Sequence, residues 1–274
     1  MNKNIVVIEP QSGWRFLNLK ELREYRDLFY FLIWKNIKVK YAQSVLGIGW
    51  AIIQPVFSMI VFTIIFGKLV NVSSDGAPYA LFSFVALVPW TYFSNSLIDT
   101  TGSLVTNRNM LTKIYFPRLI FPMTSVLSKL VDFSISLFIL FILMIWFGAI
   151  PNIGVLILPY LILLLMLTAA GIGMWLSALA VQFRDIKYAM NFGIQLLMYS
   201  APVVYPASII PSQYQLVYSI NPLVGIIEGF RSALLGTNPM PWDFIIVGSI
   251  SAFIIALTGA MYFKRMERYF ADVA

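Results

Sequence analysis

The stretch GIGWAIIQPVFSMIVFTIIFG at residues 47–67 decides the fold class of this chain. It contains no charged residue, and only Gln54 and Pro55 interrupt its apolar character. An α-helix needs about 20 mostly apolar residues to cross the hydrocarbon core of a bilayer. The stretch therefore predicts a membrane-spanning helix.

Further apolar stretches of similar length follow along the chain. They lie at about residues 77–98, 119–148, 153–183, 188–204 and 244–263. Pro151 and Asn152 mark a tight turn between the third and the fourth. The sequence therefore predicts an all-α integral membrane protein, with six transmembrane helices in a transmembrane domain over residues 47–274.

The composition of the whole chain excludes a soluble or a disordered protein. Hydrophobic residues make up 59% of the 274 residues and charged residues 11%, against roughly 45–50% and 25% in soluble domains. Disordered chains are poor in apolar residues. The chain has neither Cys nor His, which excludes thiolate or imidazole catalysis and metal sites built on these ligands. We expect no catalytic residue and no metal site.

Lysine and arginine residues are distributed unevenly between the two sides that six spans define. Segment 1–46, the loops 99–118 and 184–187 and the C-terminal tail hold 16 of the 19 basic residues, and the other side holds only Lys68 and Arg231. Because cytoplasmic loops are enriched in Lys and Arg, both termini are predicted to be cytoplasmic. The net charge of +7 is thus a topology signal and does not indicate a nucleic-acid partner.

Residues 1–46 precede the first span and contain a different kind of helix, expected at about residues 19–41. This helix mixes charged residues such as Lys20 and Arg26 with Phe29, Leu32 and Trp34. A basic amphipathic helix that is rich in aromatic residues is typical of the membrane interface. We predict an N-terminal amphipathic interfacial helix. A solvated helix of a small cytoplasmic domain is the alternative.

Residues 188–227 form a long region without any charged residue. The region is too long for one span, and prolines at positions 202, 206, 211 and 222 break it. Non-helical backbone at membrane depth must be buried in protein or line a wet cavity. We therefore predict short re-entrant helices over residues 206–236, between spans five and six, beside a transport pathway. A loop that lies on the membrane surface is the alternative.

Three regions of the sequence resemble the membrane subunits of type-2 ABC exporters that move lipid-linked polysaccharides such as O-antigen, capsule and teichoic acid. The first is IKVKY at residues 37–41 with the following stretch to Pro55, and the second is LTKIYFPR at 111–118 with Pro122. The third begins with FRDI at 183–186 and continues through APVVYP at 201–206 and NPL at 221–223 to EGFR at 228–231. Their order and spacing match over about residues 19–270.

This resemblance implies a permease subunit that exports an undecaprenyl-linked, O-antigen-like polysaccharide across the bacterial inner membrane. It also implies a homodimer that forms the channel and two copies of an ABC ATPase subunit as partners. The chain lacks the phosphate-binding motif G-x-x-x-x-G-K-[ST]. We therefore expect a transport subunit rather than an enzyme, without a cofactor of its own, whose partner subunit binds ATP.

The resemblance also implies roles for particular residues. The loop between spans two and three is similar to the coupling helix that contacts the ATPase, which gives this role to Asn107, Arg108, Met110, Leu111, Lys113 and Arg118. The segment before the last span is similar to an outer gate, which gives that role to Asn221, Pro222, Glu228 and Arg231. For Glu228 and Arg231, three residues apart, a self-contained ion pair is the alternative.

Aromatic residues near span ends are candidates for a sugar pathway, because pyranose rings rest on aromatic planes. The candidates are Trp90, Tyr92, Tyr199 and Tyr205, and a place in the aromatic belt at the membrane surface is the alternative for each. Lys129 and Asp132 lie inside the third stretch and share one helical face. We interpret them as a structural feature at the cytoplasmic interface.

Other functions are compatible with the same scaffold. A drug or lipid exporter permease is the main alternative, because no single residue encodes the cargo. A membrane enzyme is disfavoured, since a chain without His cannot form a Ser–His dyad. A channel that needs no ATPase is a further possibility, which co-purification of a nucleotide-binding partner would distinguish.

Overall fold

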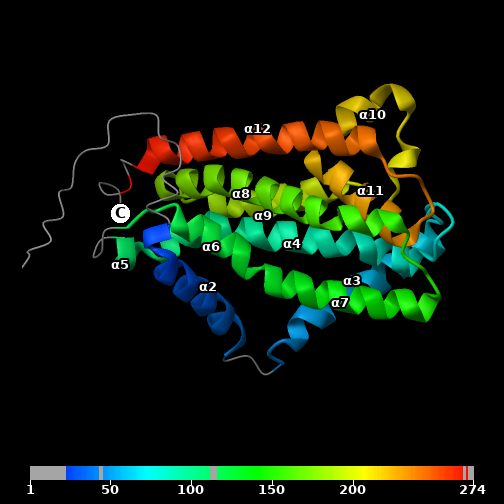
Figure 1. Ribbon diagram of the computed structural model, residues 1–274, viewed down its shortest axis with the longest axis horizontal. Coiled ribbons are helices and arrows are strands. Elements are labelled where there is room, and N and C mark those ends of the chain that lie inside the picture. Colours follow the sequence, from blue (N-terminus) through cyan, green and yellow to red (C-terminus); the bar gives the residue numbers. More distant parts are fainter. Residues whose placement is uncertain (1–22, 43–45, 112–115, 268–269, 271–274) are drawn as a thin grey trace, which may run out of the picture.

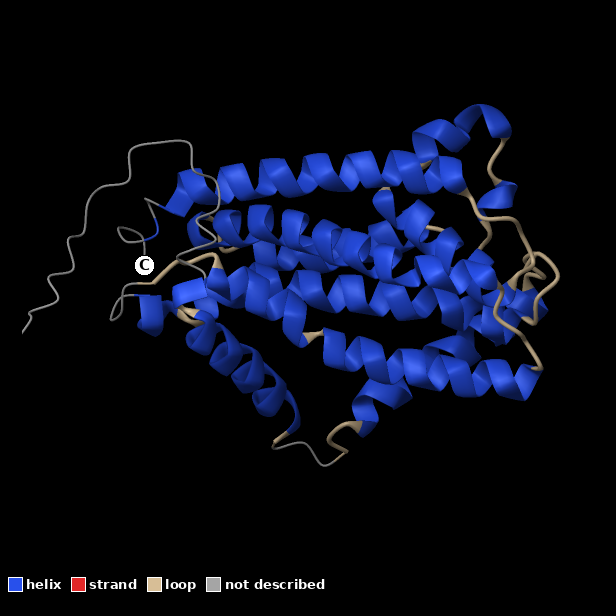
Figure 2. Ribbon diagram, in the orientation of Figure 1, coloured by secondary structure: helices blue, strands red, loops and turns tan. Residues whose placement is uncertain are grey.

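The computed structural model describes residues 23–42, 46–111, 116–267 and 270. These residues form helices joined by loops and turns and contain no strand, as Figure 2 shows. The described fold is therefore all-α, as the long apolar stretches of the sequence predict.

Five helical stretches within the described residues are long and apolar enough to cross a membrane. The first is α3 (Gly49–Phe62), which continues as the π-helix η1 (Thr63–Leu69), and the second is α4 (Tyr79–Thr106). The third consists of α6 (Ile120–Ser128) and α7 (Leu130–Phe147). The 3-10 helix η2 (Ile153–Ile157) and α8 (Leu158–Gln182) form the fourth, and α12 (Trp242–Met266) is the fifth.

The stretch predicted as a fifth span at residues 188–204 differs from this group. It corresponds to α9 (Ile186–Ser200), whose 15 residues extend about 22 Å at 1.5 Å per residue, short of the roughly 30 Å hydrocarbon core. Ala201 is extended, with φ −104° and ψ 152°, because a residue that precedes a proline disfavours the α conformation. The prediction of a helix over 188–204 is therefore wrong at its last four residues.

Helix α4 lies at the centre of the bundle, with α8, α6, α7 and α11 packed around it (Figure 1). Within its most apolar segment 83% of the residues are buried, against 11% for the span made by α3 and η1. Helices α8 and α12 cross closely, because a Cβ atom on Gly259 would lie 2.3 Å from the carbonyl oxygen of Gly171. Small residues at such crossings are typical of membrane helix packing.

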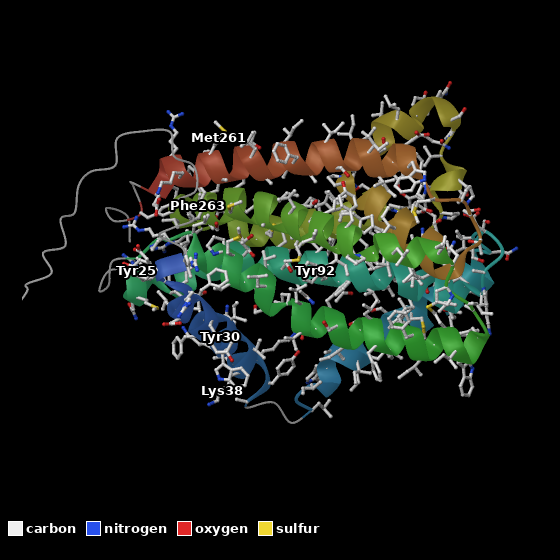
Figure 3. All side chains as sticks on the ribbon, viewed as in Figure 1. Tyr25, Tyr30, Lys38, Tyr92, Met261 and Phe263 are labelled. Carbon is white, nitrogen blue, oxygen red and sulfur yellow. The ribbon has the colours of Figure 1, made fainter. Side chains whose placement is uncertain are left out.

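Helix α2 (Arg26–Tyr41) is inclined to the other helices and packs mainly against α6 (Figure 1). It lies within the region predicted as the amphipathic helix, and the first part of that region, residues 19–22, is outside the described residues. Leu32 is buried, whereas Tyr30, Phe31 and Trp34 are exposed. Figure 3 shows Tyr30 and Lys38 on the side of α2 away from the bundle. An exposed apolar surface of this kind indicates contact with lipid or protein.

The two ends of the bundle are formed by different elements. One end holds the first residues of α2, the short helix α5 (Arg108–Leu111) and the last turn of α12, and we call it the α5 end (Figure 1). The opposite end holds the 3-10 helix η3 (Ala207–Ile209), α10 (Ser212–Tyr218) and the last turn of α11 (Pro222–Leu235), and we call it the α10 end (Figure 1).

The region predicted as a loop at residues 99–118 is helical in its first part, since α4 continues to Thr106. The polar composition of residues 99–106 suggests a loop, but two of these side chains donate to carbonyls of the helix itself. Thr101 donates to the carbonyl of Leu97 at 2.7 Å and Ser103 to that of Thr100 at 2.7 Å. Asp99 forms an ion pair with Lys129 of the neighbouring span.

Candidate functional site

At the α10 end, residues 201–206 connect α9 to η3 without helical structure, and three of their backbone carbonyls accept side-chain hydrogen bonds. Arg231 donates to Val203 at 3.0 Å and to Tyr205 at 3.2 Å. The hydroxyl of Tyr79 donates to Val204 at 2.6 Å. An unsatisfied backbone group costs several kcal/mol in a medium without water. These bonds therefore allow an irregular segment to exist inside an apolar bundle.

Arg231 also contacts Glu228 and Phe82. We use the name Arg231 clip for Arg231, Glu228 and the groups that these two side chains contact, and Arg231 is its centre. Its guanidinium pairs with Glu228 at 2.8 Å, and the side chains of both are at least nine-tenths buried. Glu228 also accepts a hydrogen bond from the backbone N–H of Ala207 at 3.0 Å. The guanidinium lies 3.6 Å from the ring centroid of Phe82 on α4. The ion pair expected from the spacing of Glu228 and Arg231 therefore forms, and it joins α11, α4 and the 201–206 segment.

The other residues predicted for the outer gate lie at the start of α11. Asn221 is the N-cap of this helix, and its side chain accepts a hydrogen bond from the N–H of Leu223 at 3.1 Å. Pro222 occupies the first helical position, where its missing N–H has no intrahelical partner to lose. The two residues thus form the break between α10 and α11.

Tyrosine hydroxyls form a chain beside the clip. The hydroxyl of Tyr205 donates to the carbonyl of Tyr199 at 2.8 Å, and the hydroxyl of Tyr218 donates to that of Tyr205 at 3.1 Å. Burial raises the pKa of the Tyr218 phenol far above its usual value, so the group remains a neutral hydrogen-bond donor. Tyr199 is 63% exposed and Tyr205 is half-buried, which leaves both partly accessible from outside the bundle.

The other two candidate aromatic residues lie inside the bundle. Trp90 and Tyr92 are 5% and 3% exposed, and Figure 3 shows Tyr92 among the packed helices. The Tyr92 hydroxyl donates to the carbonyl of Val126 at 3.1 Å, and its ring packs edge-on against Phe133. Both residues therefore stabilise the packing of α4, and we do not retain them as contacts of a sugar.

At the α5 end, the residues predicted for coupling are tied to other elements. Lys35 of α2 donates to the side-chain oxygen of Asn107 at 3.0 Å, and Asn107 donates to the carbonyl of Ser103 at 2.8 Å. Arg118 donates to the backbone carbonyl of Glu267, at the end of α12, and lies over the ring of Phe270. These contacts connect the segment after α4 with α2 and with the last span.

Of the remaining coupling candidates, the structure describes the side chains of two, Arg108 and Met110. Arg108 and Met110 belong to α5, and Met110 is partly buried against the core. Leu111 ends α5, but its side chain is outside the described residues, and Lys113 lies in the segment 112–115, which is also outside them.

Lys129 and Asp132 occupy the junction of α6 and α7, where the third span changes direction (Figure 1). They do not pair with each other. Lys129 pairs with Asp99 of α4, and Asp132 pairs with Lys40 and accepts a hydrogen bond from Tyr41, both on α2. Two ion pairs thus fix α2 and α4 to this junction. The sequence gives no direct signal for these pairs, because their members lie 30 and 92 residues apart.

A cavity of about 530 Å³ lies between α2, α4, α6 and α9 at this end. Its wall includes Lys35, Lys40, Lys129 and Lys187 together with Asp99. Within the part of the chain that the structure describes, no group of three acidic side chains could hold a metal ion. The ion pair of Lys129 with Asp99 joins α4 to the start of α7 in the wall of this cavity.

Comparisons with known proteins identify the family of this chain. Residues 27–235 match the family described as ABC-2 type transporter. The O-antigen export system permease proteins RfbA of Klebsiella pneumoniae and Myxococcus xanthus are each 26% identical to this chain, over 90% and 92% of it and 95% and 97% of their own lengths. The polysialic acid transport protein KpsM of Escherichia coli is 22% identical over 74% of this chain and 80% of its own length. Because the family match covers most of the sequence, the chain belongs to the ABC-2 type transporter family.

Proposed function

We propose that this chain is the permease subunit of an ABC transporter that exports a lipid-linked, O-antigen-like polysaccharide across the bacterial inner membrane. The observation that carries the proposal is the near full-length alignment with two O-antigen export permeases, which covers at least 90% of this chain and 95% of each relative. A separate ABC ATPase subunit supplies the energy, and the permease itself binds no cofactor.

The proposed topology has six crossings with both termini in the cytoplasm. The first turn of α2 and the end of α12 lie at the same end of the bundle (Figure 1), which supports an even number of crossings. Five helical stretches are long enough alone, and we infer that α9 with the non-helical 201–206 segment supplies the sixth crossing. The α5 end faces the cytoplasm in this proposal, because basic residues gather in the segments that meet there.

Two copies of the chain form the channel in this proposal. The span made by α3 and η1 is almost unburied within one subunit, and it exposes apolar side chains such as Phe57, Ile60 and Ile64. A second copy covers part of this surface, and the bilayer covers the rest. Tyr199 and Tyr205 remain candidates for contact with sugar rings, because both are accessible.

Coupling to the ATPase is assigned to the loop of residues 107–118. This loop lies at the α5 end, where the partner subunit binds, and two contacts transmit its movement. Lys35 connects it to α2 through Asn107, and Arg118 connects it to the end of α12 through Glu267. At the opposite end, the helices α10 and α11 re-enter the membrane and form the outer gate. The Arg231 clip holds α11 to the non-helical segment 201–206 of the fifth span.

The proposal is tested by deleting the gene and complementing the strain with the wild-type chain. We expect the surface polysaccharide to disappear on a gel and the lipid-linked polymer to accumulate inside the cell, with both changes reversed by complementation. Normal surface polysaccharide in the deletion strain would refute polysaccharide export and would favour a drug or lipid cargo.

A further inference from the structure

The two helices of the proposed outer gate are held to the bundle very differently. Every residue of α11 from Pro222 to Leu234 is buried, and a Cβ atom on Gly225 would lie 2.4 Å from the backbone carbonyl oxygen of Phe244 on α12. Helix α10 has no buried residue, and its Leu216 is 70% exposed. Elements with few buried contacts open at a lower free energy than packed ones. Movement at the α10 end is therefore expected in α10 rather than in α11.

The last turn of α11 is also fixed by hydrogen bonds to two loops. Asn152, in the turn between the third and the fourth spans, donates from its side chain to the carbonyl of Ser232 at 2.9 Å and from its backbone N–H to that of Ala233 at 3.3 Å. The hydroxyl of Ser232 donates to the carbonyl of Asn238 at 2.9 Å. Asn238 therefore belongs to the fixed part of this end, together with α11.

The loop of residues 70–78 joins η1 to α4, and it connects this fixed part to the segment that leads into α10. We call it the outer loop. Asp75 accepts a hydrogen bond from the side chain of Asn238 at 2.7 Å and, with its other carboxylate oxygen, one from the hydroxyl of Ser208 in η3 at 3.1 Å. Ser208 lies four residues before α10, and Tyr218 at the far end of α10 donates to the hydroxyl of Tyr205. The bond to Asp75 therefore holds the near end of the α10 segment.

The backbone of the outer loop is specialised for placing this carboxylate. Asp75 has a φ of +50°, and among the described residues the only other non-glycine residue with a positive φ is Asn71 of the same loop. The hydroxyl of Ser74 donates to the carbonyl of Ala77 at 2.6 Å and supports the turn. Residues in this left-handed region are uncommon and cluster where a local conformation serves a function. The position of Asp75 is therefore determined by the loop and is not that of an ordinary solvated charge.

We propose that the outer loop is a latch on the outer gate, in which Asp75 holds η3 and α10 against the fixed end of α11. Release of the bond between Asp75 and Ser208 allows α10 to move while α11 stays in place. This inference rests on the proposed function, because it names the part of the outer gate that moves when the polymer leaves.

Hydrogen exchange of the full-length chain in nanodiscs tests which helix the latch holds. Ser208→Ala and Asp75→Ala should each raise the exchange rate of α10 about three- to tenfold, because each removes the bond that holds η3, and should leave that of α11 unchanged. The double variant should exchange no faster than Asp75→Ala, since both changes remove the same bond. Asp243→Ala is the matched control, because it removes an exposed carboxylate at the same end, in the first turn of α12.

The latch is overturned if Ser208→Ala leaves the exchange of α10 unchanged, or if Asp243→Ala raises it equally. An increase in α11 as large as that in α10 would overturn the assignment of α10 as the moving helix.

A reversible cross-link tests whether this movement is needed for export. The chain has no Cys, so the variant Asp75→Cys/Ser208→Cys has one thiol pair, which a short bifunctional methanethiosulfonate can join. In the deletion strain we expect the cross-link to reduce the appearance of new surface polysaccharide at least tenfold, and a reductant to restore it. Asp75→Cys/Asn238→Cys is the control, because Asn238 belongs to the fixed part, and its cross-link should leave export unchanged.

The outcomes separate this inference from the proposed function. If Asp75→Cys/Ser208→Cys restores surface polysaccharide to the deletion strain and its cross-link reduces export no more than that of the control pair, the latch is wrong and the export function stands. If the wild-type chain is not needed for surface polysaccharide, the export function is wrong, and the exchange rates alone decide whether Asp75 holds α10.

Discussion

Replacing Arg231 by Met removes the centre of the Arg231 clip while it preserves most of the side-chain volume. The wild-type guanidinium is 3% exposed, pairs with Glu228 at 2.8 Å and satisfies the carbonyls of Val203 and Tyr205. Arg231→Met leaves a buried carboxylate with only the backbone N–H of Ala207 as a partner. We expect the variant to be strongly destabilised.

The magnitude follows from the groups that lose their partners. Removing one member of a buried ion pair costs about 3–5 kcal/mol, because the remaining charge stays buried without compensation. At about 2–4 °C per kcal/mol, the unfolding temperature should fall by roughly 6–20 °C. Adding Glu228→Gln removes the uncompensated charge, so the double variant should unfold at a higher temperature than Arg231→Met. It should remain below wild type, because the carbonyls of Val203 and Tyr205 still lack their donor, at about 1–3 kcal/mol each.

The assay is thermal unfolding of the purified chain in nanodiscs, with Lys264→Met as the control. Lys264 pairs with Glu267 at the same three-residue spacing and at 2.8 Å, but its side chain is 53% exposed. Exposed pairs contribute about 0–1 kcal/mol, so the control should unfold within a few degrees of wild type. The reasoning is refuted if Arg231→Met behaves like this control, or if the double variant unfolds no later than the single one.

Three further variants test other parts of the structure. Asp132→Asn should release the last turn of α2 from the third span and raise its hydrogen exchange several-fold, whereas Asp27→Asn, which breaks an exposed pair, should not. Gly225→Val should prevent folding, because a Cβ atom there would lie 2.4 Å from a backbone carbonyl oxygen of α12. Gly193 has open space around it, so the control Gly193→Ala should be neutral or stabilising by up to about 1 kcal/mol. Met110→Asp should abolish capture of the ATPase subunit in a pull-down. The unfolding temperature should also fall, because Met110 is partly buried against the core, so Met110→Ala serves as a control for the lost packing. Unchanged capture by Met110→Asp would contradict the coupling role of α5.

The sequence predicts the helical class and the location of most spans because each depends on a local property. An apolar run of about 20 residues is visible without any knowledge of its neighbours. The same is true of the break at Asn221 and Pro222. The helix end before Ala201 also has a local cause in Pro202, but the apolar run continues to residue 204, and the predicted span is therefore four residues too long. The pair of Glu228 and Arg231 is also local, since three residues separate its members.

What the sequence does not predict depends on contacts between distant segments. Lys129 and Asp132 look like one local pair, yet each joins a different helix, and Lys40 reaches across 92 residues to Asp132. Tyr79 and Phe82 complete the Arg231 clip from α4, and no motif marks them. Trp90 and Tyr92 have the composition of pathway residues but are buried, because burial of a membrane helix depends on its neighbours.

The central position of α4 could have been predicted from the sequence, because the least apolar span is the most buried one. It is the least apolar of the five candidate spans, with a mean hydropathy of 1.3 against 2.0–2.5 for the others, and it is the most buried. In a membrane the surroundings are as apolar as a leucine side chain, so polar side chains are placed toward protein and the apolar helices face lipid. Low hydropathy therefore identifies α4 as the central helix. Its 28 residues extend about 42 Å, from Tyr79 and Phe82 in the clip to Asp99 and Asn107 beside the lysine cavity. The helix that reaches the α5 end is therefore the same helix that contributes Tyr79 and Phe82 to the Arg231 clip at the opposite end.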